Sequence, residues 1–165
     1  MRVSEHVESA LHTCVLLAAA PEGAALPVRQ LAAFHELPAA SLAKQLQALA
    51  AAGLVSGSAG RTGGYALARP ASAIRVLEVV EAVDGREPGF RCREIRRRGP
   101  CTGARRRYSP RCAIAAAMDA AEDAWRQSLA QVSLVDLTRR VSAQLDSRTR
   151  SQTASWLTEH RRAMR

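Results

Sequence analysis

Apolar residues recur at steps of three and four along the first part of the chain, which is the spacing of one helix face. The first such stretch covers residues 4–20, and Ser4 stands where an N-cap is expected. The apolar stripe that this helix would bury consists of Val7, Leu11, Cys14 and Ala18. The pattern therefore predicts an N-terminal helix in which Cys14 is a small core residue rather than a reactive thiol.

Two further helices are predicted directly after the first one. One covers residues 27–35 and begins at a proline, and the other covers residues 39–52 and ends at Gly53, a suitable C-cap because it lacks a Cβ atom. The inward positions of the longer helix are Leu42, Leu46 and Leu49. Two short helices joined by a tight turn are typical of a helix-turn-helix, whose second helix enters the DNA major groove.

The next stretch has the pattern of a β-hairpin. Apolar residues at 54–55 and 65–67 flank a glycine-rich tip that carries Arg61. A hairpin directly after a helix-turn-helix is a wing, and its glycines let the backbone approach phosphate closely. With a fourth helix that ends at Gly85, residues 1–85 would form a DNA-binding domain. The prediction is a mainly α-helical protein with a winged helix-turn-helix and a two-stranded wing.

The second half of the chain is predicted to contain a loop, a long helix and a tail. Residues 86–112 hold three prolines, and loops of this length inside a domain are usually functional or disordered. From Ala113 onward an apolar seam repeats every three or four residues: Ile114, Met118, Ala121, Trp125, Leu129 and Val132. Because a single winged domain cannot cover this seam, we expect dimerisation helices over residues 113–141. A polar tail follows over residues 142–165, with one short helix expected around Trp156.

The charge distribution points to an anionic partner. The formal net charge is +9, and 23 of the 24 basic residues are arginine. Nine of these arginines lie between Arg91 and Cys112, opposed there only by Glu94. This balance favours nucleic acid over a membrane as the partner. Since no apolar run is long enough for a bilayer and no secretory pattern is found, we expect a cytoplasmic protein. No catalytic constellation is found either, so an enzyme is not expected.

Three cysteines of the predicted loop suggest metal or redox chemistry. Cys92, Cys101 and Cys112 lie among arginines, glycines and prolines, and a reducing compartment disfavours a structural disulfide framework. Thiolates bind iron–sulfur clusters and zinc, and neighbouring guanidinium groups lower a thiol pKa. Glu8 and His12, four residues apart on the first helix, can bind one metal together. An iron–sulfur cluster, zinc and reversible thiol oxidation all remain open on this evidence.

The order of these elements resembles the Rrf2 family of IscR/NsrR-type regulators over roughly residues 1–140. The residues that carry the resemblance are the helix-turn-helix, Ala-Gly-Leu-Val at 52–55, Gly-Arg-Thr-Gly-Gly-Tyr at 60–65, Val-Leu-Glu-Val-Val-Glu-Ala-Val-Asp-Gly at 76–85, the cysteine-bearing loop and the long helix. The resemblance implies a dimeric winged-helix transcription factor, many relatives of which carry an iron–sulfur cluster. Others sense redox state by thiols or bind small molecules.

Within this family the chain is most similar to the RsrR-like redox regulators. That resemblance implies a [2Fe-2S] cluster, preferred over [4Fe-4S], held by Glu8 and His12 of one subunit and by Cys92 and Cys112 of the other. The three loop cysteines are spaced more widely than the tight cluster of IscR and NsrR proteins. Cys101 therefore leaves a three-cysteine centre open as well.

The expected partner is double-stranded DNA with a pseudo-palindromic operator, bound by a homodimer that acts as a repressor. The residues expected to contact DNA are Ser41, Lys44, Gln45 and Gln47 on the recognition helix, which is the second helix of the helix-turn-helix, and Arg61, Thr62 and Gly63 on the wing. A small iron–sulfur electron carrier would explain the cysteines, but it would leave the helix-turn-helix and the wing without a purpose.

Overall fold

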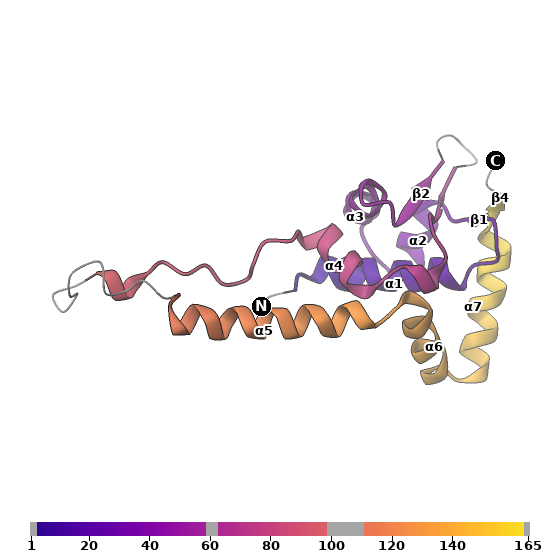
Figure 1. Ribbon diagram of the computed structural model, residues 1–165. Coiled ribbons are helices and arrows are strands. Elements are labelled where there is room, and N and C mark those ends of the chain that lie inside the picture. The colour runs from indigo at the N-terminus through magenta and orange to yellow at the C-terminus, as the bar shows by residue number, and fades with distance from the viewer. Residues whose placement is uncertain (1–2, 59–62, 99–110, 164–165) are drawn as a thin grey trace.

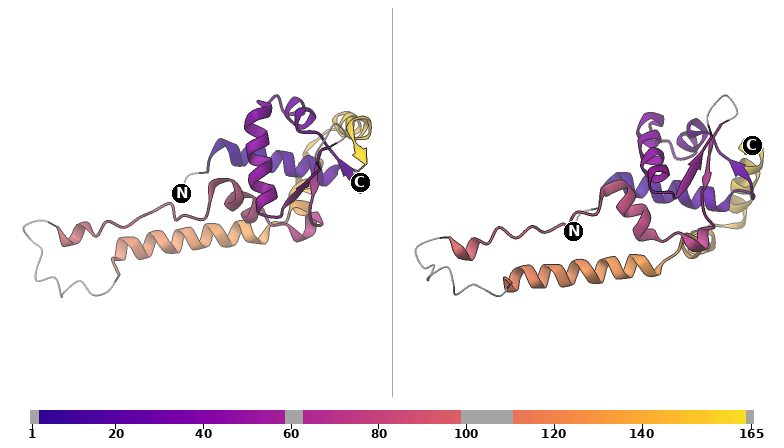
Figure 2. Two further views of the ribbon diagram at one scale, coloured as in Figure 1. Left: turned by 90° about the horizontal axis from the view of Figure 1, so that it is seen from above. Right: turned by 45° about the horizontal axis from the view of Figure 1, so that its top comes forward.

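The computed structural model describes residues 3–58, 63–98 and 111–163, and it shows a helical body from which one long arm extends (Figure 1, Figure 2). The helices of the body are α1 (Glu5–Ala19), α2 (Val28–Phe34), α3 (Ala39–Ala51), α4 (Val76–Asp84), α6 (Leu134–Gln144) and α7 (Ser147–His160). Its short strands are β1 (Ala24–Ala25), β2 (Val55–Gly57), β3 (Tyr65–Leu67) and β4 (Arg162–Ala163). The arm is residues 85–98 together with residues 111–131, which contain α5 (Ala113–Gln131).

The α1 helix lies at the centre of the body, where it packs against α3, α4 and α6. Val7 and Cys14 are buried as predicted, while Leu11 and Ala18 are only partly buried. Ala10, Leu16 and Leu17 are buried as well, which widens the predicted stripe. A helix covered on several sides needs a broader apolar face than one packed on a single neighbour.

The sequence predicts the start of α1 correctly, but it mispredicts how this end of the helix is stabilised. Ser4 occupies the N-cap position without a capping hydrogen bond from its side chain. Its backbone N–H donates to the Asp84 carboxylate at 2.9 Å, and its hydroxyl donates to the same carboxylate. The side chain therefore ties the start of α1 to the end of α4 instead of capping its own helix.

The helix-turn-helix follows the prediction closely. Leu42, Leu46 and Leu49 of α3 are fully buried. The helix ends before Gly53, which has a φ of +69°, a region that glycine adopts without steric cost. The N–H of Leu54 donates to the carbonyl of Leu49 at 2.9 Å, so the chain turns directly from α3 into the wing.

The predicted wing is an antiparallel pair of β2 and β3, in which Ser56 faces Ala66. Tyr65 also exchanges two backbone hydrogen bonds of 2.9 Å with Leu26, which attaches the wing base to the segment after β1. At Gly64 a Cβ atom would lie 2.8 Å from the backbone carbon of Leu26. Only glycine fits this close approach of two backbones.

The segment predicted as a polar tail is ordered against the body over most of its length. Its helix, α7, is much longer than the short helix expected around Trp156, and Leu157 enters the main core. Trp156 packs on Phe34 of α2, with ring centroids 4.6 Å apart. The chain then returns to the wing side, where β4 pairs antiparallel with β1. These contacts between distant parts of the chain have no signature in the periodicity of the tail.

The arm projects far beyond the body (Figure 1, Figure 2). The two ends of α5 differ in how far their apolar side chains are buried. Trp125, Leu129 and Val132, near its C-terminal end, pack with Val76 and Val80 of α4. At the other end Ile114 and Met118 are 69% and 39% exposed. The continuous seam predicted from the sequence is therefore half covered by the chain itself and half exposed.

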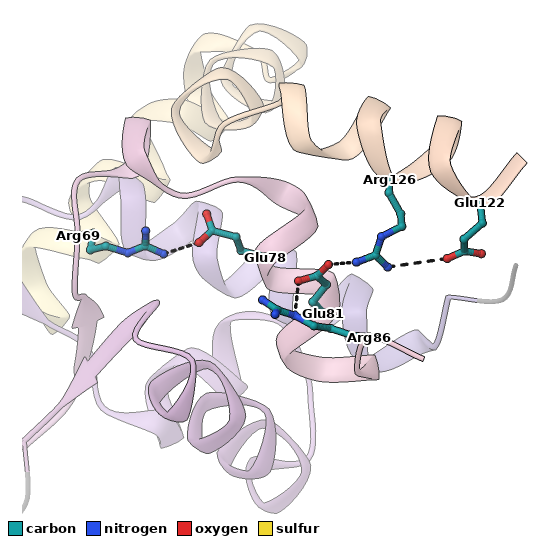
Figure 3. Close-up of polar contacts among 6 residues, drawn as sticks. All are labelled: Arg69, Glu78, Glu81, Arg86, Glu122 and Arg126. Atoms are coloured by element: carbon teal, nitrogen blue, oxygen red, sulfur yellow. Dashed lines mark hydrogen bonds and ion pairs between the residues drawn. The ribbon is translucent and has the colours of Figure 1, made fainter. Parts of the chain in front are cut away.

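Ion pairs join the arm to the body at α4 (Figure 3). The Glu81 carboxylate, whose side chain is only 11% exposed, accepts hydrogen bonds from Arg126 of α5 and from Arg86 at 2.8 Å. Glu78, one turn earlier, pairs at 2.7 Å with Arg69, which follows the wing strand β3. The α4 helix thus contacts the arm on one side and the wing on the other. Among the described residues, no helix combines the length and the apolar content needed to cross a bilayer.

Candidate DNA-binding face and metal centre

The α3 helix and the wing lie on the same side of the body, at the top of Figure 1. Lys44 and Gln47 are exposed on α3, and Ser41 is partly exposed. On the wing, Gly63 is partly exposed, whereas Arg61 and Thr62 lie outside the described residues. The described part of this face therefore offers a cation, an amide and a hydroxyl to the groove and backbone of DNA.

Gln45 does not belong to this outer face. Its side chain is only 7% exposed, and its Oε1 accepts a hydrogen bond from the Ser9 hydroxyl of α1 at 2.9 Å. Its Nε2 lies 3.4 Å from Nδ1 of His6. Gln45 stands three residues after Leu42 and four before Leu49, so helix geometry turns it inward. That spacing could have revealed its role as a tie between α3 and α1, and we remove it from the expected DNA contacts.

Two of the three loop cysteines meet at the far end of the arm. Cys112 is the N-cap residue of α5, and its thiol lies close enough to that of Cys92, from the extended segment, for the Cys92 side chain to help lower its pKa. The pKa of the Cys112 thiol lies below its usual value because the first-turn N–H groups of Ala115 and Ile114 stabilise the thiolate, as does the nearby guanidinium of Arg96. Cys101 lies outside the described residues.

A glutamate that sequence reasoning did not single out organises these thiols. Glu94 has a left-handed backbone, with a φ of 49°, and its N–H donates to the Cys92 sulfur at 3.4 Å. Its carboxylate accepts a hydrogen bond of 2.9 Å from Arg96. Glu94 therefore holds the guanidinium beside both sulfur atoms. The unusual backbone conformation leaves no sign in the residue type, so the sequence alone could not show it.

Glu8 and His12 are both exposed on α1 and line one hollow of about 580 Å³ between α1 and the α2–α3 turn. His35 lines the same hollow, with its ring centroid 5.9 Å from that of His12. Burial, together with the nearby His12, lowers the pKa of His35. The Nε2 atom of His35 is buried and has no hydrogen-bond partner among the described residues. Sequence reasoning gave His35 no role.

The two pairs of candidate ligands lie in different parts of one chain. The α5 helix begins at the outer end of the arm, whereas α1 lies within the body (Figure 2). In the part of the chain that the structure describes, no three His, Cys, Asp or Glu side chains come together as a metal site. Two adjoining thiols, one with a lowered pKa, suit an iron–sulfur cluster, but they supply only half of a four-ligand set. One chain offers two half-sites.

Comparison with known proteins points to one family. The Rrf2 family, described as "Iron-dependent Transcriptional regulator", matches residues 3–140. HTH-type transcriptional regulators from two strains of Mycobacterium tuberculosis are 38% identical over 85 residues, which are 52% of this chain and 53% of each relative. The chain thus spans about half the length of the curated relatives it matches.

Solved structures show the same fold at low sequence identity. CymR, the global cysteine regulator of B. subtilis, has a TM-score of 0.67 at 20% identity, over 85% of this chain and 98% of CymR. T. potens IscR has a TM-score of 0.66 at 18% identity, over 89% of this chain and 93% of IscR. The oxidised form of Staphylococcus aureus CymR has a TM-score of 0.62 at 21% identity, over 84% and 96% of the two chains.

Proposed function

The chain belongs to the Rrf2 family of transcriptional regulators, and on that premise we propose that it is a repressor whose operator binding is controlled by an iron–sulfur cluster. Rrf2 proteins are DNA-binding regulators rather than enzymes, and they generally act as dimers. The observation that carries the proposal is the meeting of Cys92 and Cys112 at the start of α5, where the pKa of Cys112 is lowered.

The proposed ligands are Glu8 and His12 from one subunit and Cys92 and Cys112 from the other. Two thiolates, a carboxylate and an imidazole make four donors, which is the number that either a [2Fe-2S] or a [4Fe-4S] cluster takes. We favour [2Fe-2S] because the resemblance to the RsrR-like regulators implies it. The separation of the two half-sites within one chain supports a cluster at the subunit interface. The exposed Ile114 and Met118 support it too, because they form an apolar surface that a second arm would cover.

A bound cluster would supply a one-electron change between an oxidised and a reduced state. The role of Arg96 in that change is electrostatic. Its guanidinium lies close enough to both thiols for attraction to the two thiolates to raise its own pKa, after the stronger effect of Glu94. A cation in this position stabilises added negative charge, so it favours the reduced state.

The contacts of α4 suggest how the arm could influence DNA binding. Through Glu81 and Arg126, α4 is joined to α5, and on its other side it packs against the recognition helix α3. A change of the arm would therefore reach α3, which carries Ser41, Lys44 and Gln47. Through Glu78 and Arg69 it would also reach the base of the wing, whose proposed DNA contacts are Arg61, Thr62 and Gly63. Two such faces in a twofold dimer would read a pseudo-palindromic operator.

A thiol-switched regulator without a cluster is the second candidate. The observation that favours it is the proximity of Cys92 to Cys112, since two neighbouring thiols, of which Cys112 has a lowered pKa, are also suited to reversible oxidation. Zinc held by the same cysteines is a variant of this candidate. These alternatives differ from the first in iron and sulfide content and in colour.

The test is iron and sulfide analysis of anaerobically purified protein, together with visible absorption spectra. The proposal expects coloured protein with about two irons per site. The colour should be lost in Cys92→Ala, Cys112→Ala, Glu8→Ala and His12→Ala, and kept in Cys101→Ala. Glu5→Ala, at an exposed α1 position beside the same hollow, is the matched control and should keep its colour. If Cys101→Ala loses its colour while Glu8→Ala and His12→Ala keep theirs, a three-cysteine centre replaces the mixed one.

A further inference from the structure

A second hollow, of about 430 Å³, lies between α1, the end of α2 and the hairpin of α6 and α7. Its walls are mainly apolar, with side chains from all four helices and from the turn between α6 and α7: Val15, Leu16, Phe34, Val141, Leu145 and Leu157. A hollow of this size with an apolar lining is typical of small-molecule sites. One of its walls, α7, lies beyond residues 3–140, which are the residues that match the Rrf2 family.

The charged groups around this hollow have one sign. Arg150 of α7 lies at its edge, and its guanidinium donates to the backbone carbonyl of Ser142 in α6 at 3.2 Å. That bond occupies one of the five N–H donors of the guanidinium. No carboxylate occurs among the described residues that line the hollow. An occupant with a single negative charge would therefore meet a cation and no opposing anion.

Two of the hydroxyl groups in the lining are already used as donors within their own helices. Thr138 donates to the carbonyl of Leu134 at 2.7 Å, and Thr153 donates to that of Thr149 at 3.0 Å. Both hydrogens are thus used within their own helices. Besides the Arg150 guanidinium, the polar side chains of the lining that can orient an anion are Ser142 and the imidazoles of His12 and His35.

We propose that this hollow binds a small monocarboxylate with an apolar body. The carboxylate lies on Arg150, and the apolar body lies against α1, α6 and the Phe34 ring. A single cation matches a single charge, and the limited volume favours a small molecule over a peptide segment. The binding of this ligand does not depend on whether the protein holds a cluster.

The position of His12 links the hollow to the proposed cluster site. His12 lines both this hollow and the one that contains Glu8, so an occupant would touch a proposed cluster ligand. This link rests on the proposed function. A carboxylate effector that shifts the visible spectrum would support the link, while binding to the colourless protein tests the site by itself.

The experiment is isothermal titration calorimetry of the 165-residue chain with phenylbutanoate and octanoate, and with phenylbutanol as the uncharged analogue. We expect saturable binding of at least one carboxylate, at one molecule per chain, and much weaker binding of the alcohol. Arg150→Gln should weaken carboxylate binding about tenfold or more, because it removes a charge-assisted hydrogen bond. Arg148→Gln is the matched control, since Arg148 is exposed on the same helix outside the lining.

A second variant guards against loss of folding in the first. Ala154 is exposed at the edge of the hollow, so Ala154→Leu fills the space without disturbing the core, and it should abolish binding. The proposal is overturned if neither carboxylate binds saturably at millimolar concentration, or if phenylbutanol binds as well as phenylbutanoate. Unchanged binding in Arg150→Gln or in Ala154→Leu would also overturn it, since the ligand would then sit elsewhere.

Discussion

The body and the arm handle their apolar residues in opposite ways. In the body, α1 buries six residues against its neighbours, whereas α5 buries only Ala115 among the described residues. The outer half of α5 leaves Ile114 69% exposed, although its spacing continues the seam that packs on α4 farther along. The body thus satisfies its own core, and the arm presents a surface that one chain does not cover.

The cysteines show the same contrast. Cys14 is fully buried in α1, and burial raises its pKa to about 12. Cys112 stands at the start of α5, where helix N–H groups and Arg96 lower its pKa. The same residue type is therefore inert in the body and activated on the arm. This difference teaches that burial and exposure decide whether a cysteine of this chain is suited to chemistry.

The largest expected effect separates the two regions by stability. Leu46→Ala in the body should lower the free energy of unfolding by about 2–5 kcal/mol, because Leu46 is fully buried and leaves a cavity. Ile114→Ala on the arm should cost under about 1 kcal/mol within the folded chain, since the side chain is mostly exposed. Urea unfolding of both variants at one protein concentration provides the measurement. Equal losses would remove the distinction between body and arm.

The next prediction concerns what covers the arm. The double variant Ile114→Asp with Met118→Asp should raise the dissociation constant of the proposed dimer at least about tenfold, because it would place charges in the proposed apolar interface. Sedimentation velocity at micromolar concentration measures this change, and circular dichroism should show unchanged helix content. Ala120→Asp is the control, as an exposed position on the other face of α5. Dimers of undiminished affinity in the double variant would mean that the exposed seam is not the interface.

The ion pairs of Glu81, which join the arm to the body, are expected to contribute less to the stability of the fold than the core does. Glu81→Gln should reduce stability by about 1–3 kcal/mol, because the nearly buried carboxylate pairs with both Arg126 and Arg86. Glu87→Gln breaks an exposed pair with Arg91 and should lower the stability much less, by about 0–0.5 kcal/mol. Thermal unfolding of the two variants gives the comparison. If Glu87→Gln lowers the stability as much as Glu81→Gln does, the ion pairs at α4 do not stabilise the fold more than an exposed pair.

The smallest effect is a pH dependence that arises from Cys14. Its folded pKa of about 12 lies above the ordinary thiol value of 9.0, so the folded chain keeps the neutral thiol while the unfolded chain ionises first. Stability should therefore be intact below pH 9 and fall between pH 9 and about 12, by roughly 1 kcal/mol one pH unit above the ordinary value. Urea unfolding at pH 7 and pH 10 measures it.

Cys14→Ala tests the origin of that pH dependence. The variant removes the only titrating group at this position, so its stability should fall less than that of the wild type between pH 7 and pH 10. In the wild-type protein, iodoacetamide at neutral pH should modify Cys112 and leave Cys14 unmodified until the chain unfolds. Rapid modification of Cys14 in the folded protein would show that α1 opens readily at this point.

Local features of the fold were predictable because neighbouring residues produce them. The ends of α3, the positive φ at Gly53 and the pairing of β2 with β3 follow from helix periodicity, glycine and alternation within a few residues. The candidate site was predictable in part for the same reason. Glu8 and His12 share a face of α1 because they stand one turn apart, and this is a property of the helix alone.

The remaining features depend on contacts between distant segments. Only the folded chain turns Gln45 toward Ser9, directs Ser4 to Asp84 and docks α7 through Leu157. It also brings Cys92 to Cys112, across a segment whose length and charges do not specify where its ends meet. The sequence by itself determined most of the helical stretches and supplied the candidate ligands, because hydrogen bonding and periodicity act locally. The tertiary structure alone decided which side chains meet, because long-range packing selects among rotamers and faces that local sequence leaves equally available.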